Sequence, residues 1–199
     1  MTDNVDEVTD RNMKEAVEFA TRFFTENNVR RVLIGGTEDN TALFRGLLPK
    51  AWQSLVIGTF HLGMTASKDE VLNKTMQIGK QAEHKQETRL LEAVMTSAAK
   101  KQGGVIQLDD TLKAIHDGRV QTLVIKSGFR APGFQCTSCG YLTAHKHKKC
   151  PFCGSAFTNI PDAVELAVRK VMQHGGEVEV LQVAQPPNQF GNIGAILRY

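Results

Sequence analysis

The sequence predicts an α/β protein built from two lobes, the second of which is an α/β/α sandwich carrying a small cysteine-rich insertion. Three observations support this prediction. Short apolar runs typical of strands alternate with amphipathic helical patterns along both halves of the chain. A long stretch with a polar middle separates the two halves, and all four cysteines fall within residues 136–153. A length of 199 residues suits one large domain or two small ones.

The first lobe is predicted to begin with a helix over residues 11–27, where apolar side chains recur on one face from Met13 to Phe24. Two buried strands follow, in RRVLIGG and SLVIGTF, and a short helix between them starts after Thr37 as N-cap and ends at Pro49. Because two strands seldom form an independent domain, this α/β layer is predicted to be incomplete. Its unfinished sheet edge also permits dimerisation.

Residues 67 to about 100 are predicted to form one long helix, with Ser67 as N-cap and no proline inside. Its centre, GKQAEHKQETR, is almost wholly polar, whereas both ends carry apolar residues. A helix that is polar all round is usually solvated on every side. We therefore expect an α/β layer over 1–80, a linking helix over 81–100 and a second domain over 101–199.

The second domain is predicted to start with a strand over 105–108, a helix over 110–117 that stops at Gly118, and a strand over 120–126. The cysteine-rich insertion over 134–158 follows. A helix in DAVELAVRKVMQHGG, an alternating strand over 177–184 and a last strand in IGAILRY complete the domain. This order of strands and helices predicts the α/β/α sandwich.

The cysteines form two Cys-x2-Cys pairs separated by ten residues, a spacing typical of a tetrahedral zinc site: Cys136, Cys139, Cys150 and Cys153. A glycine follows each pair and allows a turn with positive φ, in which backbone N–H groups face the thiolates. Two disulfides are an alternative that requires an oxidising compartment, and a redox-active site would need only one pair. The expected cofactor is one structural Zn²⁺ ion, because four thiolates fill the coordination shell.

The segment between the two pairs is basic and consists of His145, Lys146, His147, Lys148 and Lys149. Its histidines could replace a cysteine as metal ligands, but four thiolates already suffice, so exposed loop histidines are expected. Basic groups on a small zinc domain, with Tyr141 nearby, are also suited to contact RNA phosphates or an acidic partner. A solvated loop without a partner is the alternative.

Catalytic residues are not expected. LIGGTEDN places two glycines between a strand and a helix, yet it lacks a complete phosphate-binding pattern and carries two acids. Asp109 and Asp110 lie at a predicted helix start, where carboxylates favour the positive helix end, and capping is the expected role. All four cysteines are assigned to the metal, so no nucleophile with a paired base remains.

The composition excludes several other classes of protein. A net charge of +3 is too small to indicate nucleic-acid binding by itself. The sequence holds no apolar run of the roughly 18 residues that a membrane-spanning helix needs. Since the N-terminal residues are acidic and polar, they do not resemble a signal peptide. A cytoplasmic protein without a membrane partner is expected.

LDDTLKAIHDGRVQTLVI and the terminal FGNIGAILRY closely resemble the C-terminal domain of the class-I release factors of archaea and eukaryotes, a family that includes the ribosome-rescue factor Pelota. In this family the last domain is an α/β/α sandwich like that of kink-turn-binding ribosomal proteins, and several members carry a zinc ribbon at the corresponding place. The segment RRVLIGGTEDNTALFRGLLPK and the long helix after it resemble the second half of the family's middle domain.

The resemblance implies a role in translation termination or ribosome rescue, with the ribosome or a translational GTPase as partner. Family members release peptides with a GGQ loop in the middle domain, but the glycine pairs here are followed by Thr37, Val105 and Glu177. Either the chain is a fragment of a longer protein, or it is a relative without release activity. Asp109 and Asp110 replace the asparagine and glutamate of kink-turn binders, which argues against that kind of RNA site. A non-enzymatic docking part is therefore expected, with an RNA-binding module as the alternative.

Overall fold

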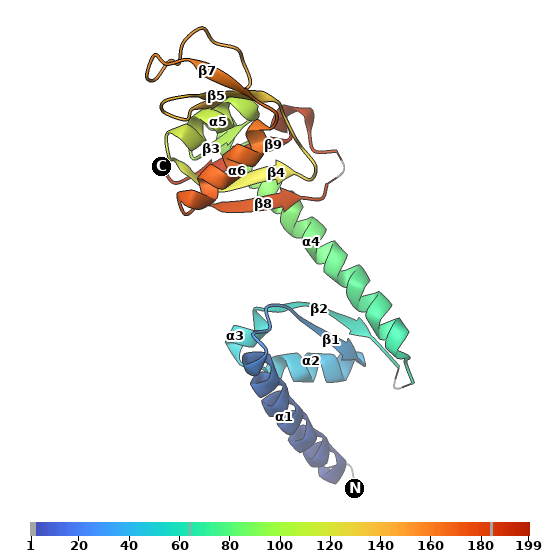
Figure 1. Cartoon of the computed structure of the whole chain (residues 1–199). Helices are drawn as coiled ribbons and strands as arrows, with labels where there is room; N and C mark the ends of the chain where they lie inside the picture. Colours follow the sequence, from blue (N-terminus) through green and yellow to red (C-terminus); the bar gives the residue numbers. More distant parts are fainter. Residues whose placement is uncertain (1–2, 64, 184) are drawn as a thin grey trace. The chain divides into compact units, whose positions relative to one another are not determined.

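The computed structural model describes residues 3–63, 65–183 and 185–199, and divides the chain into two compact units, Met1–Glu83 and His84–Tyr199. Figure 1 shows the elements of both units, coloured along the sequence. Helices and strands alternate through the chain, so the predicted α/β class is confirmed. In the described part of the chain, no helix is both long enough and apolar enough to cross a membrane.

The first unit contains a two-stranded parallel sheet of β1 and β2. Its elements are α1 (Asp3–Glu26), β1 (Val32–Gly36), α2 (Glu38–Leu47), α3 (Lys50–Gln53), β2 (Val56–His61) and the first half of α4 (Lys68–Ala99). Val17 of α1 packs with Val32 and Ile34 of β1 in a small apolar core. The short helix α3 was not predicted, and Phe23, expected on the buried face of α1, is exposed.

Two of the predicted helix starts are confirmed by their capping bonds. The Thr37 hydroxyl accepts a hydrogen bond from the backbone N–H of Asn40 (3.4 Å), and the Ser67 hydroxyl accepts one from Glu70 (3.2 Å). The glycine pair before Thr37 lies at the end of β1, where a Cβ atom on Gly35 would lie 2.8 Å from the Phe60 ring. These contacts are those of close packing between β1 and β2.

The second unit is built on a four-stranded sheet in the order β3-β9-β4-β8, with only the β4–β8 pair parallel. Its further elements are α5 (Leu108–His116), α6 (Ala163–Gln173) and the 3₁₀ turn η1 (Asn188–Phe190); the strands are β3 (Gly104–Ile106), β4 (Val120–Lys126), β8 (Glu177–Leu181) and β9 (Ile193–Leu197). The strand predicted over 177–184 ends at Leu181, and its last predicted residue lies outside the described residues.

Helices cover both faces of this sheet. Side chains of β4 point alternately to the two faces, and each face packs against helices. Leu123 and Ile125 join α5 and α6 in the larger core, whereas Val124 faces a second core with Leu91 and Val94 of α4. The α/β/α sandwich is therefore confirmed, and its third layer is the end of α4. The long helix, expected over 67 to about 100, thus provides its buried residues, Leu91 and Val94, to the second unit.

The third strand set belongs to the insertion. Strands β5 (Gly133–Cys136), β6 (Leu142–Thr143) and β7 (Phe157–Ile160) form a separate antiparallel sheet in the order β6-β5-β7. We call residues 133–160 the ribbon. It leaves the sandwich after β4 and returns directly into α6 (Figure 1).

Candidate metal centre

The two cysteine pairs form turns with matching backbone hydrogen bonds. In the first turn, the N–H of Cys136 donates to the carbonyl of Tyr141 (2.8 Å) and the N–H of Gly140 donates to the carbonyl of Cys136 (3.1 Å). In the second turn, Cys150 donates to Ser155 (2.9 Å) and Gly154 donates to Cys150 (2.9 Å). The φ angles of the two glycines are +69° and +76°, which a residue with a side chain adopts only at a cost in energy. The predicted role of these glycines is confirmed.

The four sulfur atoms converge on one point. Sγ atoms of all four cysteines lie within 4.8 Å of one another, with 3.4 Å between Cys136 and Cys153 and 3.6 Å between Cys139 and Cys150. Four sulfurs at about 2.3 Å from a central zinc ion would stand about 3.8 Å apart in a tetrahedron. None of the cysteines is in a disulfide. The cluster therefore fits a single metal ion bound by four thiolates.

Protonation of the thiols differs within the cluster. Hydrogen bonds from the backbone and side chain of Ser155 lower the pKa of Cys153 to about 6, whereas burial raises the pKa of Cys139 to about 12. A divalent cation would deprotonate the buried thiol as well, since a coordinated thiol loses its proton. Metal binding at this cluster should consequently release protons and weaken as the pH falls.

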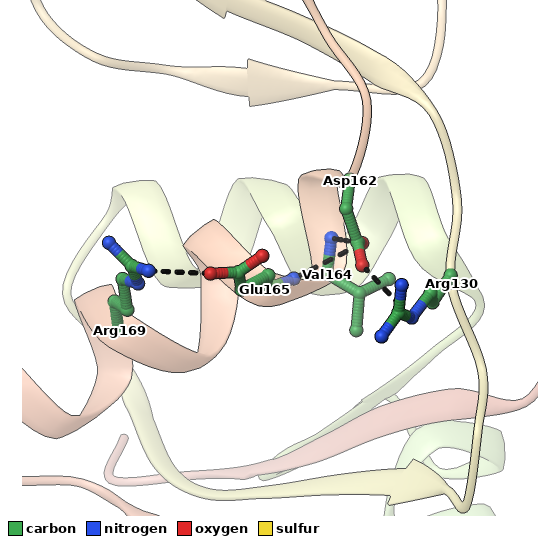
Figure 2. Close-up of polar contacts among 5 residues, drawn as sticks. All are labelled: Arg130, Asp162, Val164, Glu165 and Arg169. Carbon is green, nitrogen blue, oxygen red and sulfur yellow. Dashed lines mark hydrogen bonds and ion pairs between the residues drawn. The ribbon is translucent and has the colours of Figure 1, made fainter.

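The two ends of the ribbon meet at the start of α6. The backbone N–H of Ala163 donates to the carbonyl of Ala131 (2.7 Å), and the Arg130 guanidinium lies 3.8 Å from the Asp162 carboxylate. The same carboxylate caps α6 by accepting hydrogen bonds from the N–H groups of Val164 and Glu165, as Figure 2 shows. This neck closes the insertion, so the ribbon can be added to the sandwich without breaking it.

The ribbon is also packed against α5 through an aromatic cluster. His116, at the end of α5, has its ring centroid 5.1 Å from that of Tyr141 and 4.2 Å from that of Phe152. Leu142 of β6 is buried in the main core of the sandwich. Desolvation by burial, together with the nearby positive charge of Lys170, lowers the pKa of His116, which favours the neutral imidazole.

A second contact joins the ribbon to the start of α5. The Nε2 atom of His145 lies 2.8 Å from a carboxylate oxygen of Asp109. The capping role predicted for Asp109 and Asp110 is wrong: the N-cap residue is Gln107, whose side chain makes no capping bond, and both acids lie in the first turn of the helix. His145 is exposed as expected, yet it is paired with α5.

The basic segment 145–149 forms an exposed loop between the two turns. The side chains of Lys146, Lys148 and Lys149 are all exposed to solvent, and the ring of His147 lies 6.0 Å from that of Phe157. Neither histidine is part of the sulfur cluster in the described residues. The aromatic cluster around His116 escaped the sequence analysis, because 25 or more residues separate His116 from Tyr141 and Phe152 and no spacing rule relates them.

Comparison with known proteins gives one family match and one short sequence match. Residues 1–80 match the model of a family described as bacterial archaeo-eukaryotic release factor family 10. A short segment of 65 residues is 32% identical to Reverse gyrase 1 of Sulfurisphaera tokodaii and covers 33% of this chain but 5% of that protein.

Several solved structures cover nearly the whole chain, among them those of Dom34 and Pelota. S. cerevisiae Dom34, described as a translation termination-like factor involved in RNA quality control pathways and interacting with Hbs1, is 10% identical over 97% of this chain and 53% of its own, with a TM-score of 0.59. A model of ribosome-bound archaeal Pelota and ABCE1 is 14% identical over 95% of this chain and 49% of that one, with a TM-score of 0.57. The chain spans about half the length of these proteins, and at these identities the likeness shows the fold.

Proposed function

We propose that this chain, a release-factor- and Pelota-like C-terminal part, is a docking element that acts in translation termination or ribosome rescue in the cytoplasm. The observation that carries the proposal is the agreement of two independent comparisons: the family match over residues 1–80 and the Dom34 and Pelota fold over at least 95% of the chain. The partners we propose are the ribosome or a translational GTPase, since the similar structures are those of ribosome-bound Pelota and of Dom34, which interacts with Hbs1.

In this proposal the metal is one Zn²⁺ ion with a structural role. Four cysteine sulfurs would complete a tetrahedral shell and leave no coordination position for water or substrate. The ribbon has few buried residues of its own, so metal binding would supply most of its folding free energy. The residues that hold the ion are Cys136, Cys139, Cys150 and Cys153.

We further propose that the chain itself is not a catalyst. It contains no GGQ sequence, and its cysteines converge on one another instead of on a histidine base. Peptide release by this chain from a stalled ribosome would contradict this part of the proposal.

Co-sedimentation with purified bacterial ribosomes tests the docking proposal. We expect the zinc-loaded chain to pellet with ribosomes at low and at physiological salt. The matched variant Cys150→Ser, which should lose the folded ribbon, reports how much of the binding depends on it. A parallel pull-down with a purified translational GTPase tests the second partner. If the intact chain stays in the supernatant and captures no GTPase, the docking proposal is wrong.

The second candidate function is an RNA-binding module, which the exposed basic loop 145–149 favours. Each phosphate contact makes the affinity fall with salt, whereas a protein interface responds less. Binding that is lost between low and physiological salt would favour RNA contacts as the main source of affinity. Binding that persists would favour the protein-docking function.

A further inference from the structure

The ribbon and its flanks form a stretch without negative side chains. From Gly118 to Pro161 the sequence contains six lysines and arginines, two histidines and no aspartate or glutamate. Three of these cations belong to the exposed loop between the cysteine pairs. The loop's one ion pair among the described residues joins His145 to Asp109 of α5, and the three lysines remain available to attract a polyanion.

An exposed aromatic ring lies within this stretch. Phe152 stands between Cys150 and Cys153, and it is 45% exposed. The ring is supported by two other rings, with centroids 4.2 Å away in His116 and 4.7 Å away in Tyr141. The turn formed by the second cysteine pair fixes its backbone. Phe152 therefore presents a fixed apolar face to water. A partner that covered this face would gain the free energy of removing it from water.

The charges next to this apolar face are also mainly positive. Lys170 of α6 approaches the first cysteine turn, since a Cβ atom on Gly140 would lie 3.0 Å from its Nζ atom. Lys148 and Lys149 immediately precede Cys150, just before the turn that contains Phe152. The opposing charges are Asp117, which acts on His116 together with Lys170, and Asp109, which acts with Asp117 on Tyr141. A partner that combines phosphate charge with flat apolar faces matches this surface.

We propose that the ribbon binds unpaired RNA, with a base stacked on Phe152 and adjacent phosphates held by Lys148 and Lys149. Stacking is available only to unpaired bases, since the faces of paired bases are covered by their neighbours. The inference rests on the proposed function in one respect: action at the ribosome makes RNA the relevant nucleic acid. It goes further by naming Phe152 as the contact residue and single-stranded RNA as the ligand.

Fluorescence anisotropy with a labelled ten-nucleotide oligouridine tests the proposal, using the full zinc-loaded chain. We expect Phe152→Leu, which keeps an apolar side chain but removes the aromatic face, to weaken binding at least about fivefold. The matched control is Phe19→Leu, an exposed phenylalanine of α1 in the other unit, which should bind as the original chain does. Zinc content and thermal melting verify that each variant is folded.

Two further measurements separate stacking from charge. Replacing Lys148 and Lys149 by alanine should reduce the slope of log affinity against log salt by about 1.4, at roughly 0.7 per phosphate contact with a single strand. A blunt RNA duplex of ten base pairs should bind more weakly than oligouridine. Unchanged affinity of Phe152→Leu, equal binding of the duplex, or no binding of oligouridine would each overturn the inference.

The ribosome experiment has a separate outcome. A chain that sediments with ribosomes but does not bind oligouridine overturns this inference and leaves the docking proposal in place. A chain that binds oligouridine through Phe152 but neither sediments with ribosomes nor captures a translational GTPase overturns the docking proposal and supports the RNA site.

Discussion

Substitution of Val94 by alanine tests whether the end of α4 is an integral layer of the second unit. Val94 is fully buried, and it packs with Leu91, Val124 and Phe190 on the face of the sheet opposite α5. Gly194 of β9 makes room for this contact, since a Cβ atom there would lie 3.0 Å from Cγ1 of Val94. The helix is thus seated directly on the backbone of the sheet.

The expected loss follows from the two methyl groups removed. At about 0.8 kcal/mol for each buried carbon, their transfer accounts for about 1.6 kcal/mol, and the cavity left behind raises the total to about 2–3 kcal/mol. For a unit of roughly 100 residues this corresponds to a fall in Tm of about 8–12 °C. The control is Leu72→Ala on the same helix, where the side chain is 53% exposed and the change should stay within about 0.5 kcal/mol.

Two optical probes assign the loss to the correct unit. Far-UV circular dichroism follows both units, whereas Trp52, the single tryptophan, packs on Phe24 in the first unit and reports on that unit by fluorescence. We expect Val94→Ala to lower the circular dichroism midpoint more than the fluorescence midpoint. If Val94→Ala is as stable as Leu72→Ala, the helix end is not a layer of the sandwich and the reasoning fails.

Three other predictions concern the ribbon. Cys150→Ser should abolish binding of one zinc per chain and remove the ribbon's protection from amide hydrogen exchange; retained one-to-one zinc would show that the ligand set is wrong. Gly140→Ala should destabilise the ribbon by about 1–3 kcal/mol, because its φ of +69° is strained for alanine, and a chelator should consequently remove the metal faster. Burial and Lys170 lower the pKa of His116, so the unfolded chain takes up a proton at a higher pH than the folded chain, and stability should fall as the pH drops through about 6.5. His116→Gln should make the free energy of unfolding, measured by urea titration, depend less on pH. An unchanged pH profile in this variant would contradict the prediction.

Local chemistry was sufficient to predict much of the fold. The hydroxyls of Thr37 and Ser67 cap helices within three residues of themselves, and the glycines after the cysteine pairs close turns of five residues. Hydrophobic periodicity, capping residues and turn residues therefore identify most of the helices and strands, and the spacing of the cysteines identifies their cluster. The resemblance to release factors, carried by the segments 108–126 and 190–199, agrees with the comparisons.

The errors share a different cause, namely contacts between distant segments. Gln107 begins α5 with a φ of +68°, because its N–H donates to the carbonyls of Phe190 and Ile193 on the neighbouring chain segment. That geometry leaves Asp109 beyond the cap and free to pair with His145 across 36 residues. Likewise, the sequence indicates that the end of α4 is apolar, but not that Val94 packs on the sheet of the second unit. Tertiary packing determines these features, and a local sequence pattern does not show which distant segments will come into contact.

The most direct test of the docking account is a cryo-electron microscopy reconstruction of purified ribosomes incubated with the intact, zinc-loaded chain. The account predicts density for the sandwich and ribbon on the ribosome. The RNA inference adds that the loop 145–149 and Phe152 face ribosomal RNA. Ribosomes without such density, at chain concentrations that saturate the sedimentation assay, would contradict it.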